Sequence, residues 1–240
     1  PDRLTQVYNW LKNKQYCTLC GEPADTVHRL CGSCETEMPW LGGHCLICAL
    51  PLARGGLTCG GCLRWPPSFD RVEAPWRYAF PVDSLITRFK HQAQWPLGRL
   101  LGELLAQHLL HAFDEGLARP DLLLPVPLAE RRQRRRGFNQ AAMLARWLGE
   151  QLHLPLQQDW LRRTSDTQAQ QQLDAAARKR NLRRAFALTA ESRVSGLHLA
   201  LVDDVLTTGA TAESLARLLK RAGAARVDVY CLARTPKPGD

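Results

Sequence analysis

Residues 199–212, LALVDDVLTTGATA, decide the fold and the site that we expect in this chain. Four apolar residues run directly into the adjacent carboxylates Asp203 and Asp204, and a short loop rich in threonine follows. An apolar run of this length with such flanks is typical of a strand buried in a parallel sheet. Because open parallel sheets bind ligands beyond the carboxyl ends of their strands, we expect both aspartates at a binding site.

The loop of residues 206–211 has the composition of a phosphate-binding segment. It leads into a predicted helix, residues 211–223, and the first amides of a helix lack internal partners and favour an anion. Gly209 lets the backbone approach a ligand closely, and the neighbouring hydroxyls can donate hydrogen bonds, namely those of Thr207, Thr208 and Thr211. A ribose 5-phosphate suits this arrangement, with its phosphate in the loop, its hydroxyls on the carboxylates and Mg²⁺ to relieve their charge.

The carboxyl part of the chain alternates predicted helices with predicted strands. Apolar residues recur at helical spacing in four segments, residues 82–92, 97–113, 138–152 and 211–223. Short apolar runs predict strands at residues 121–128, 154–163, 196–205 and 225–234, after an extended piece that Pro75 interrupts. This order predicts a parallel sheet flanked by helices. We expect His108 and His111 at the surface and Cys231 in the core, without chemistry.

Eight of the nine cysteines lie within the first 62 residues, as four CxxC pairs separated by ten residues each. Two such pairs complete a tetrahedral four-thiolate shell, which suits a structural zinc ion, so we expect two ions. The expected ligands are Cys17, Cys20, Cys31, Cys34, Cys45, Cys48, Cys59 and Cys62. Sequential pairing fits two short ribbons, but interleaved or nested pairing, disulfides and an iron–sulfur cluster remain open. His28 and His44 are interpreted as polar surface residues.

The formal charge of the 240-residue chain is +9, and the excess lies in its central third. Between residues 131 and 184 there are thirteen basic and four acidic residues, a block that is usually solvated but also suits phosphates or nucleic acid. No apolar run approaches the roughly 20 residues that a bilayer crossing requires. With no leader in the sequence, we expect a cytoplasmic protein without membrane contact.

The hydrophobic run, Asp203-Asp204 and the TTGAT sequence together resemble the phosphoribosyl pyrophosphate (PRPP) motif of type I phosphoribosyltransferases. The cysteine pairs, FKHQ with Lys90, PVPL…RRRGFNQ and the polar stretch 163–186 extend the resemblance to the ComF family, which includes competence ComFC proteins and enterobacterial DNA-utilisation relatives. This resemblance implies an α/β fold: a double zinc ribbon at residues 1–70, then a type I phosphoribosyltransferase-like parallel sheet with flanking helices at residues 71–240.

The resemblance also implies roles for individual residues. Asp203, Asp204 and Arg136 are the expected catalytic residues, and Val126 and Pro127 lie where these transferases place a pyrophosphate loop. A mobile flap is expected between residues 164 and 181. The expected PRPP-binding residues are Asp203, Asp204, Val205, Leu206, Thr207, Thr208, Gly209, Ala210, Thr211, Val126, Pro127, Lys90, Arg178 and Arg180. Any single arginine of the run RRQRRRG is more often plain solvent-exposed surface.

Three functions are compatible with these features. The first is a transferase in which an acceptor displaces pyrophosphate from the ribose carbon of PRPP. The second is a module that senses PRPP or a nucleotide without turnover. The third is an adaptor in DNA import or utilisation that docks a helicase-type partner or single-stranded DNA. Purine-salvage enzymes often carry a carboxylate where this chain has Thr207, which disfavours a purine acceptor.

The cysteine spacing predicts a metal content. Atomic emission of the purified chain should find about two zinc ions per molecule, because eight thiolates fill two four-ligand shells. A preparation that folds without any zinc would contradict this prediction.

Overall fold

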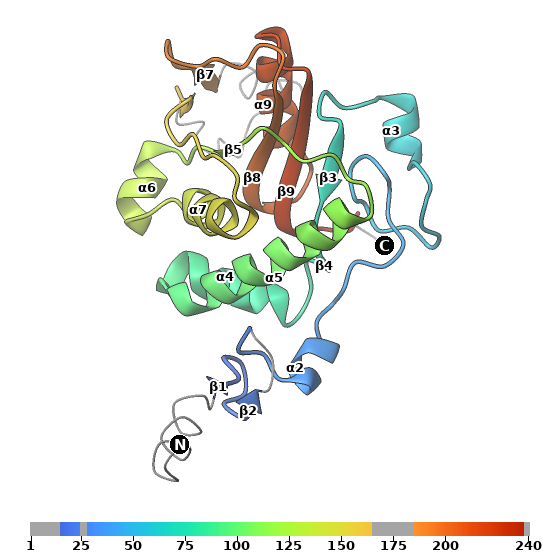
Figure 1. Cartoon of the computed structure of the whole chain (residues 1–240), viewed down its shortest axis with the longest axis vertical. Coiled ribbons are helices and arrows are strands. Elements are labelled where there is room, and N and C mark those ends of the chain that lie inside the picture. Colours follow the sequence, from blue (N-terminus) through green and yellow to red (C-terminus); the bar gives the residue numbers. More distant parts are fainter. Residues whose placement is uncertain (1–14, 25–27, 165–184, 238–240) are drawn as a thin grey trace, which may run out of the picture.

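A parallel sheet forms the centre of the computed structural model, which describes residues 15–24, 28–164 and 185–237 (Figure 1). Its strands follow the order β3 (Arg71–Glu73), β9 (Arg226–Arg234), β8 (His198–Leu206) and β5 (Leu122–Pro125). β4 (Trp76–Arg77) continues the line of β3 along β9, after the interruption at Pro75 that the sequence predicts. The predicted parallel sheet is therefore confirmed.

Helices cover both faces of this sheet. On one face lie α4 (Val82–Gln92), α5 (Trp95–Asp114) and α7 (Gln140–Leu152), and α9 (Ala210–Arg221) covers the other face. The leucine stripe of α5 is buried, as its spacing predicts. Gly102 lets α5 approach α7 closely, since a Cβ atom there would lie 3.2 Å from the Trp147 side chain.

The predicted strand at residues 154–163 is only partly correct. Leu156 forms a single parallel bridge to Leu123, beside β5. The end of the segment, β6 (Leu161–Arg163), pairs instead with β7 (Phe186–Leu188) as an antiparallel pair outside the main sheet. Pro155 has no amide hydrogen, so the pairing beside β5 does not extend upstream of this bridge.

The two cysteine-rich segments lie at different sides of the molecule (Figure 1). The first contains β1 (Gln15–Tyr16), β2 (Pro23–Ala24) and α2 (Gly32–Thr36), and its buried residues join the core formed with α4 and α5. The second, which ends in α3 (Gly60–Arg64), packs Ile47, Cys48 and Ala49 against the core on the opposite face of the sheet.

A short strap between the two segments, residues 39–41, runs along the edge strand β4. Trp40 forms an antiparallel bridge with Trp76, and their rings lie 5.6 Å apart between centroids. The amide of Leu41 donates to the carbonyl of Pro75 at 2.7 Å, and the amide of Arg77 donates to the carbonyl of Pro39 at 2.9 Å. The strap thus acts as one more strand at this edge.

His108 is not a plain surface residue, contrary to the sequence prediction. Its Nε2 atom lies 3.2 Å from Oε2 of Glu73, a carboxylate that is only 4% exposed. Arg71 donates to the other oxygen of Glu73. The prediction failed because β3 and α5 meet only in the tertiary structure, whereas His111, one turn further along α5, is exposed. Among the described residues, no helix is long and apolar enough to cross a membrane.

Glu73 provides a test of this buried network. Burial opposes its ionisation, but the hydrogen bond from His108 and the charge of Arg71 prevail and lower its pKa. A lowered carboxyl pKa stabilises the fold above the unfolded-state value of about 4.3, and this stabilisation is lost as the pH falls through the folded-state value. We therefore expect Glu73→Gln to destabilise the protein by about 2 kcal/mol at pH 7 and by less below pH 4.

Thermal unfolding followed by circular dichroism at both pH values measures this difference. Glu115→Gln is the matched control, because Glu115 pairs with His111 on the surface and is 69% exposed. Its substitution should change stability by less than about 0.5 kcal/mol at either pH. Equal effects of the two substitutions at pH 7 would contradict the proposed contribution of Glu73.

Candidate functional site

The eight cysteines of the CxxC pairs form two clusters in the structure. Within each cluster the four Sγ atoms lie within 4.8 Å of one another: Cys17, Cys20, Cys31 and Cys34 in the first, and Cys45, Cys48, Cys59 and Cys62 in the second. Sulfur atoms of a tetrahedral zinc site are about 3.8 Å apart, as Zn–S distances of about 2.3 Å require. The contacts Cys20–Cys31 at 3.6 Å and Cys48–Cys59 at 3.7 Å fit this geometry. The pairing is therefore sequential.

One thiol in each cluster is prepared to ionise. Burial opposes ionisation of Cys17, but backbone amides that donate to its sulfur prevail and lower its pKa to about 6. The same balance lowers the pKa of Cys45 to about 7, and the amide of Cys59 lies 3.3 Å from its sulfur. Burial raises the pKa of other thiols in the clusters, such as Cys34 and Cys62. The grouping of four sulfur atoms in each cluster is what fits two structural zinc ions.

The acidic pair lies at the carboxyl end of β8. Adjacent strand residues point to opposite faces of a sheet, so the two carboxylates differ in surroundings. Asp204 is 5% exposed and faces the side of α4, where Lys90 lies with its Nζ atom 2.8 Å from Oδ1. The other carboxylate oxygen of Asp204, Oδ2, is buried and has no hydrogen-bond partner among the described residues.

Asp203 has a raised pKa. Burial raises its pKa to about 7, and the neighbouring charge of Asp204 adds to the rise. Its Oδ1 atom accepts a hydrogen bond of 2.8 Å from the amide of Asp204. A carboxyl group with this pKa exchanges its proton near neutral pH, so Asp203 can both donate and accept hydrogen bonds.

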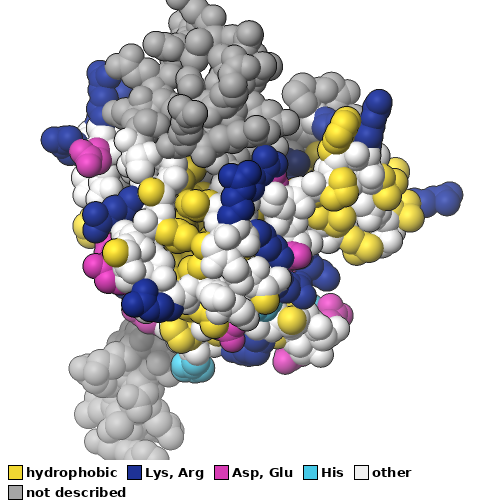
Figure 2. Space-filling model, turned by 90° about the horizontal axis from the view of Figure 1, so that it is seen from above, with side chains coloured by type: hydrophobic (Ala, Val, Ile, Leu, Met, Phe, Trp, Pro, Cys, Tyr) yellow, Lys and Arg dark blue, Asp and Glu magenta, His cyan; other side chains and the backbone are white. Residues whose placement is uncertain are grey.

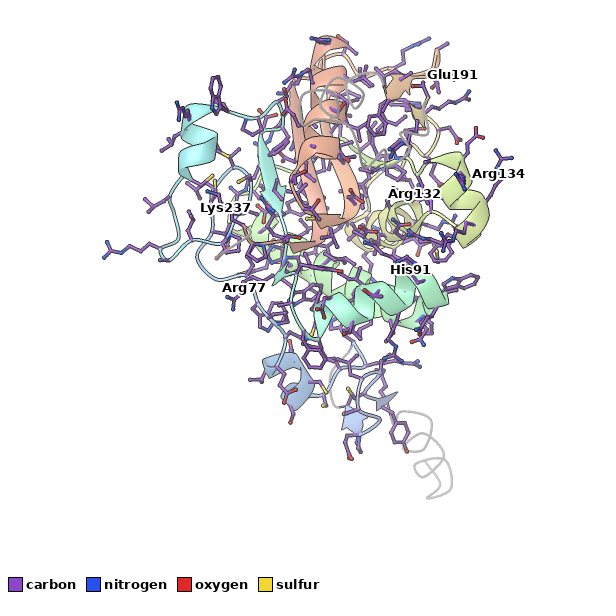
Figure 3. The ribbon with its side chains drawn as sticks, turned by 180° about the vertical axis from the view of Figure 1, so that it is seen from behind. Arg77, His91, Arg132, Arg134, Glu191 and Lys237 are labelled. Carbon is purple, nitrogen blue, oxygen red and sulfur yellow. The ribbon has the colours of Figure 1, made fainter. Side chains whose placement is uncertain are left out.

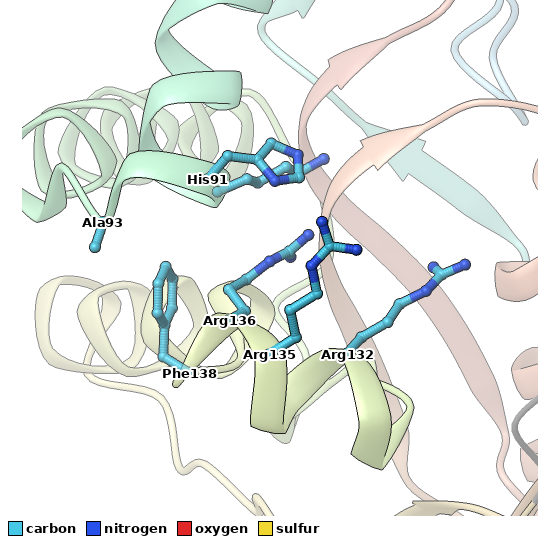
Figure 4. A pocket seen from close by; sticks show the side chains of 7 residues that line it. His91, Ala93, Arg132, Arg135, Arg136 and Phe138 are labelled. Carbon is cyan, nitrogen blue, oxygen red and sulfur yellow. The ribbon is translucent and has the colours of Figure 1, made fainter.

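A basic pocket of about 500 Å³ opens beside Lys90, between α4 and the short helix α6 (Glu130–Arg136). Figure 4 shows Arg135 and Arg136 directed toward the side of His91 on α4, with Arg132 further along α6 and Phe138 at the left of the view. The lining residues are Lys90, His91, Ala93, Arg132, Arg135, Arg136 and Phe138. Burial lowers the pKa of His91, and the positive charges around it lower it further, so this side chain is neutral at pH 7.

The loop after β8 has the predicted form. Thr207 and Thr208 are exposed, and Gly209 adopts a left-handed conformation with φ of 75° at the start of α9. Only glycine takes this conformation without strain. The Thr208 hydroxyl lies 3.4 Å from the amide of Ala210. Thr211 is half-buried within the first turn of α9, whose leading amides lack intrahelical partners.

The other residues predicted to bind PRPP differ in their position and in the backbone groups that they could offer a ligand. Val205 and Leu206 still belong to β8, and Ala210 begins α9. Both backbone groups of Val126 are already used, since its amide donates to Val202 and its carbonyl accepts from Asn139. Pro127 follows, without an amide hydrogen. Arg178, Arg180 and most of the predicted flap lie outside the described residues.

The arginine run forms a helix, which lies outside the four helical segments predicted from the sequence. Glu130 lies in its first turn and Gly137 ends it in a left-handed conformation, both typical of helix termini. Arg132, Arg135 and Arg136 share one face and line the pocket, whereas Arg134 pairs with Glu130 on the exposed face. Figure 3 shows Arg134 on the outer side of α6, away from His91.

Sequence reasoning therefore missed five pocket residues: His91, Ala93, Arg132, Arg135 and Phe138. A helical spacing of three and four residues within the run 130–136 was the signal that separates its two faces. The sequence predicted Lys90 as a PRPP-binding residue. In the structure it links the acidic pair to the pocket, because it contacts Asp204 and lines the pocket.

Two family models match the chain in separate places. The model described as "Double zinc ribbon domain" matches residues 10–63, and the one described as "Phosphoribosyl transferase domain" matches residues 134–239. Among solved structures, a glutamine PRPP amidotransferase from Bacillus subtilis is 22% identical and covers 56% of this chain and 25% of its own. The TM-score of this match is 0.38.

Curated relatives align over nearly the whole chain. The DNA utilization protein YhgH of Escherichia coli K12 is 40% identical over 221 residues, which is 91% of this chain and 96% of that protein. Competence protein F of Haemophilus influenzae is 35% identical and covers 85% of this chain and 90% of its own. Competence protein ComFC of Bacillus subtilis is 28% identical, with 86% and 85% covered. The chain therefore belongs to the ComF/YhgH family, which combines a double zinc ribbon with a phosphoribosyltransferase domain.

Proposed function

We propose that this protein binds PRPP with Mg²⁺ across the carboxyl end of its sheet. The observation that carries this proposal is the position of Asp204. Its strand continues directly into the loop 207–209, and its carboxylate contacts Lys90, which lines the basic pocket. One ligand with a phosphate at each end of a ribose would use the loop, the acidic pair and the pocket together.

The acidic pair supports the ribose part of this proposal. Buried polar atoms are normally satisfied, so the unpartnered Oδ2 of Asp204 requires a donor from outside the described protein atoms. A ribose hydroxyl or a water on Mg²⁺ is such a donor. Asp203, with its pKa near 7, can accept from one hydroxyl or donate to another. Mg²⁺ binds through a few carboxylates and substrate phosphates, and these two side chains would hold it.

The basic pocket supports the diphosphate part. Lys90 and the three pocket arginines carry fixed positive charges, and neutral His91 adds a hydrogen-bonding group. Positive groups that face a leaving diphosphate stabilise the charge that develops on it when the bond to the ribose carbon breaks. An acceptor nucleophile would then form the new bond at that carbon, with pyrophosphate as the other product. The loop residue Thr207 disfavours a purine acceptor, as the sequence indicates.

Isothermal titration with Mg²⁺ and PRPP tests the binding proposal. Arg132→Ala/Arg135→Ala should weaken PRPP binding by about tenfold to a hundredfold, because each substitution removes the charge-assisted hydrogen bonds of one arginine to the diphosphate. The same double variant should bind ribose 5-phosphate as the wild type does, because that ligand lacks the diphosphate.

The matched control is Arg131→Ala/Arg134→Ala, which removes the same charge from the exposed face of the same helix. Arg134 is 79% exposed, so this control should leave PRPP affinity within about twofold of the wild type. If both double variants lose affinity equally, the pocket does not hold the diphosphate. If the wild type binds neither ligand, the binding proposal is wrong.

Turnover is measured separately, as pyrophosphate release from PRPP across a panel of candidate acceptors. Asp203→Asn/Asp204→Asn is the control for background hydrolysis. Release by the wild type above this control would support a transferase. Tight PRPP binding with release equal to the control for every acceptor would support the sensing module instead.

The relatives are named for DNA utilisation and competence, and we propose that this chain serves the same process. The second ribbon favours an adaptor role within it, because four large apolar side chains are exposed there: Leu46, Leu57, Leu63 and Trp65. Figure 2 shows hydrophobic side chains gathered on this lobe, at the right of the view. Exposed apolar patches of this kind are typical of protein docking surfaces.

This adaptor role predicts a separable defect. Leu63→Ser/Trp65→Ser should reduce growth on external DNA while PRPP affinity and zinc content stay unchanged, because both side chains point to solvent and are 71% and 75% exposed. Tyr16→Ser, which alters an exposed aromatic residue on the first ribbon, is the control. Normal growth of the double variant would contradict the adaptor role.

A further inference from the structure

Arg234 is a buried arginine at the end of β9, directly behind the loop that follows β8. It is 7% exposed, and its neighbour in the parallel ladder is Leu206, the last residue of β8. The ladder therefore fixes the guanidinium at the base of the loop 207–209. None of the features used for the proposed function involves this residue.

The guanidinium of Arg234 donates hydrogen bonds to backbone carbonyl groups in three separate segments. Its Nη1 atom donates to the carbonyls of Leu206 at 3.0 Å and of Thr207, and also to that of Thr235 at 2.6 Å. Its Nε atom donates to the carbonyl of Cys48 at 2.9 Å. A planar guanidinium with five donors can serve such divergent acceptors, whereas a lysine ammonium cannot.

No carboxylate pairs with Arg234 in the part of the chain that the structure describes. Carbonyl dipoles solvate its charge but leave the net positive charge in place. An uncompensated buried charge is costly, and an anion bound nearby would reduce that cost. The loop is the adjacent place where an anion would bind.

The hydrogen bonds of Arg234 also fix the direction of the loop backbone. They draw the carbonyls of Leu206 and Thr207 toward the interior of the protein, away from an anion on the other side of the loop. We propose that Arg234 is a positioning residue for phosphate binding at this loop, and that it couples the loop to the second cysteine cluster. This proposal rests on the proposed function.

The coupling between the loop and the second cluster runs through Cys48. This residue belongs to the second cluster, and its backbone carbonyl accepts a hydrogen bond from Arg234. A second link lies beside it: the amide and hydroxyl of Ser68 donate to Glu213 in the first turn of α9, at 2.6 and 3.0 Å. The first cluster packs on the helices α4 and α5 and has no such connection among the described contacts. Metal in the second cluster and phosphate in the loop should therefore stabilise each other, because coupling between two sites is reciprocal.

Zinc release from the full-length, zinc-loaded protein tests the coupling without any substitution. A chromogenic chelator is added, and the release of the two ions is followed with and without saturating ribose 5-phosphate. We expect the ligand to slow the release of one ion severalfold and to leave the other unchanged. Cys20→Ser, which disrupts the first cluster, identifies the protected ion as that of the second.

Arg234→Lys tests the positioning role, with Arg226→Lys at the opposite end of the same strand as the matched control. Arg226 pairs with Asp228 and is remote from the loop. We expect Arg234→Lys to keep two zinc ions and its circular dichroism spectrum but to weaken ribose 5-phosphate binding by about tenfold or more, because the retained charge cannot replace the forked hydrogen bonds. The protection of zinc by the ligand should disappear in this variant only.

The outcomes separate the two proposals. If the wild type binds ribose 5-phosphate but Arg234→Lys binds it equally well, Arg234 does not position the loop. If the ligand protects both ions or neither, the coupling is wrong even when Arg234→Lys fails to fold. If the wild type binds neither ribose 5-phosphate nor PRPP, the proposed function itself is overturned.

Discussion

The parallel pairing of β8 with β9 is the interaction on which the rest of the structure depends. Both strands have neighbours on each side, and their register aligns Asp203 with Cys231 and Leu206 with Arg234. A strand buried on both faces is mostly apolar, which explains the uninterrupted run before Asp203. The acidic pair lies near the carboxyl end of β8, and Arg234 lies at the same end of β9. Asp228 is a buried exception within β9, where it pairs with Arg226 and His198.

Some of the charges at this end of the sheet compensate one another, and others add together. Lys90 neutralises one oxygen of Asp204, while the raised pKa of Asp203 reduces the repulsion between the two carboxylates. The pocket arginines lie on the side of α6 that faces α4, so their charges add in the same space. Such a field attracts an anion of high charge and orients it relative to the acids. A neutral sugar would gain little from it.

Much of this molecule was predictable because its signals are local. The cysteine spacing predicted the eight ligands but left their pairing open, and the structure groups them sequentially. The apolar run with the TTGAT loop predicted the strand, the turn and the helix that follows. The features that escaped prediction depend on tertiary contacts. Lys90 was a predicted ligand residue, but its contact with Asp204 spans more than a hundred residues of sequence and was not predicted. Arg234 looks in the sequence like an ordinary strand end. The arginine run was visible, but only its helical form separates Arg135 from Arg134.

The strap at residues 39–41 has a consequence for the behaviour of the chain in concentrated solution. An edge strand with free amides and carbonyls can pair with a strand of another molecule, which is a common route to aggregation. In this protein the strap occupies groups of Pro75 and Arg77 at the β4 edge, and Trp40 covers Trp76. The segment that joins the two ribbons therefore shields this edge of the sheet from pairing with another copy of the chain.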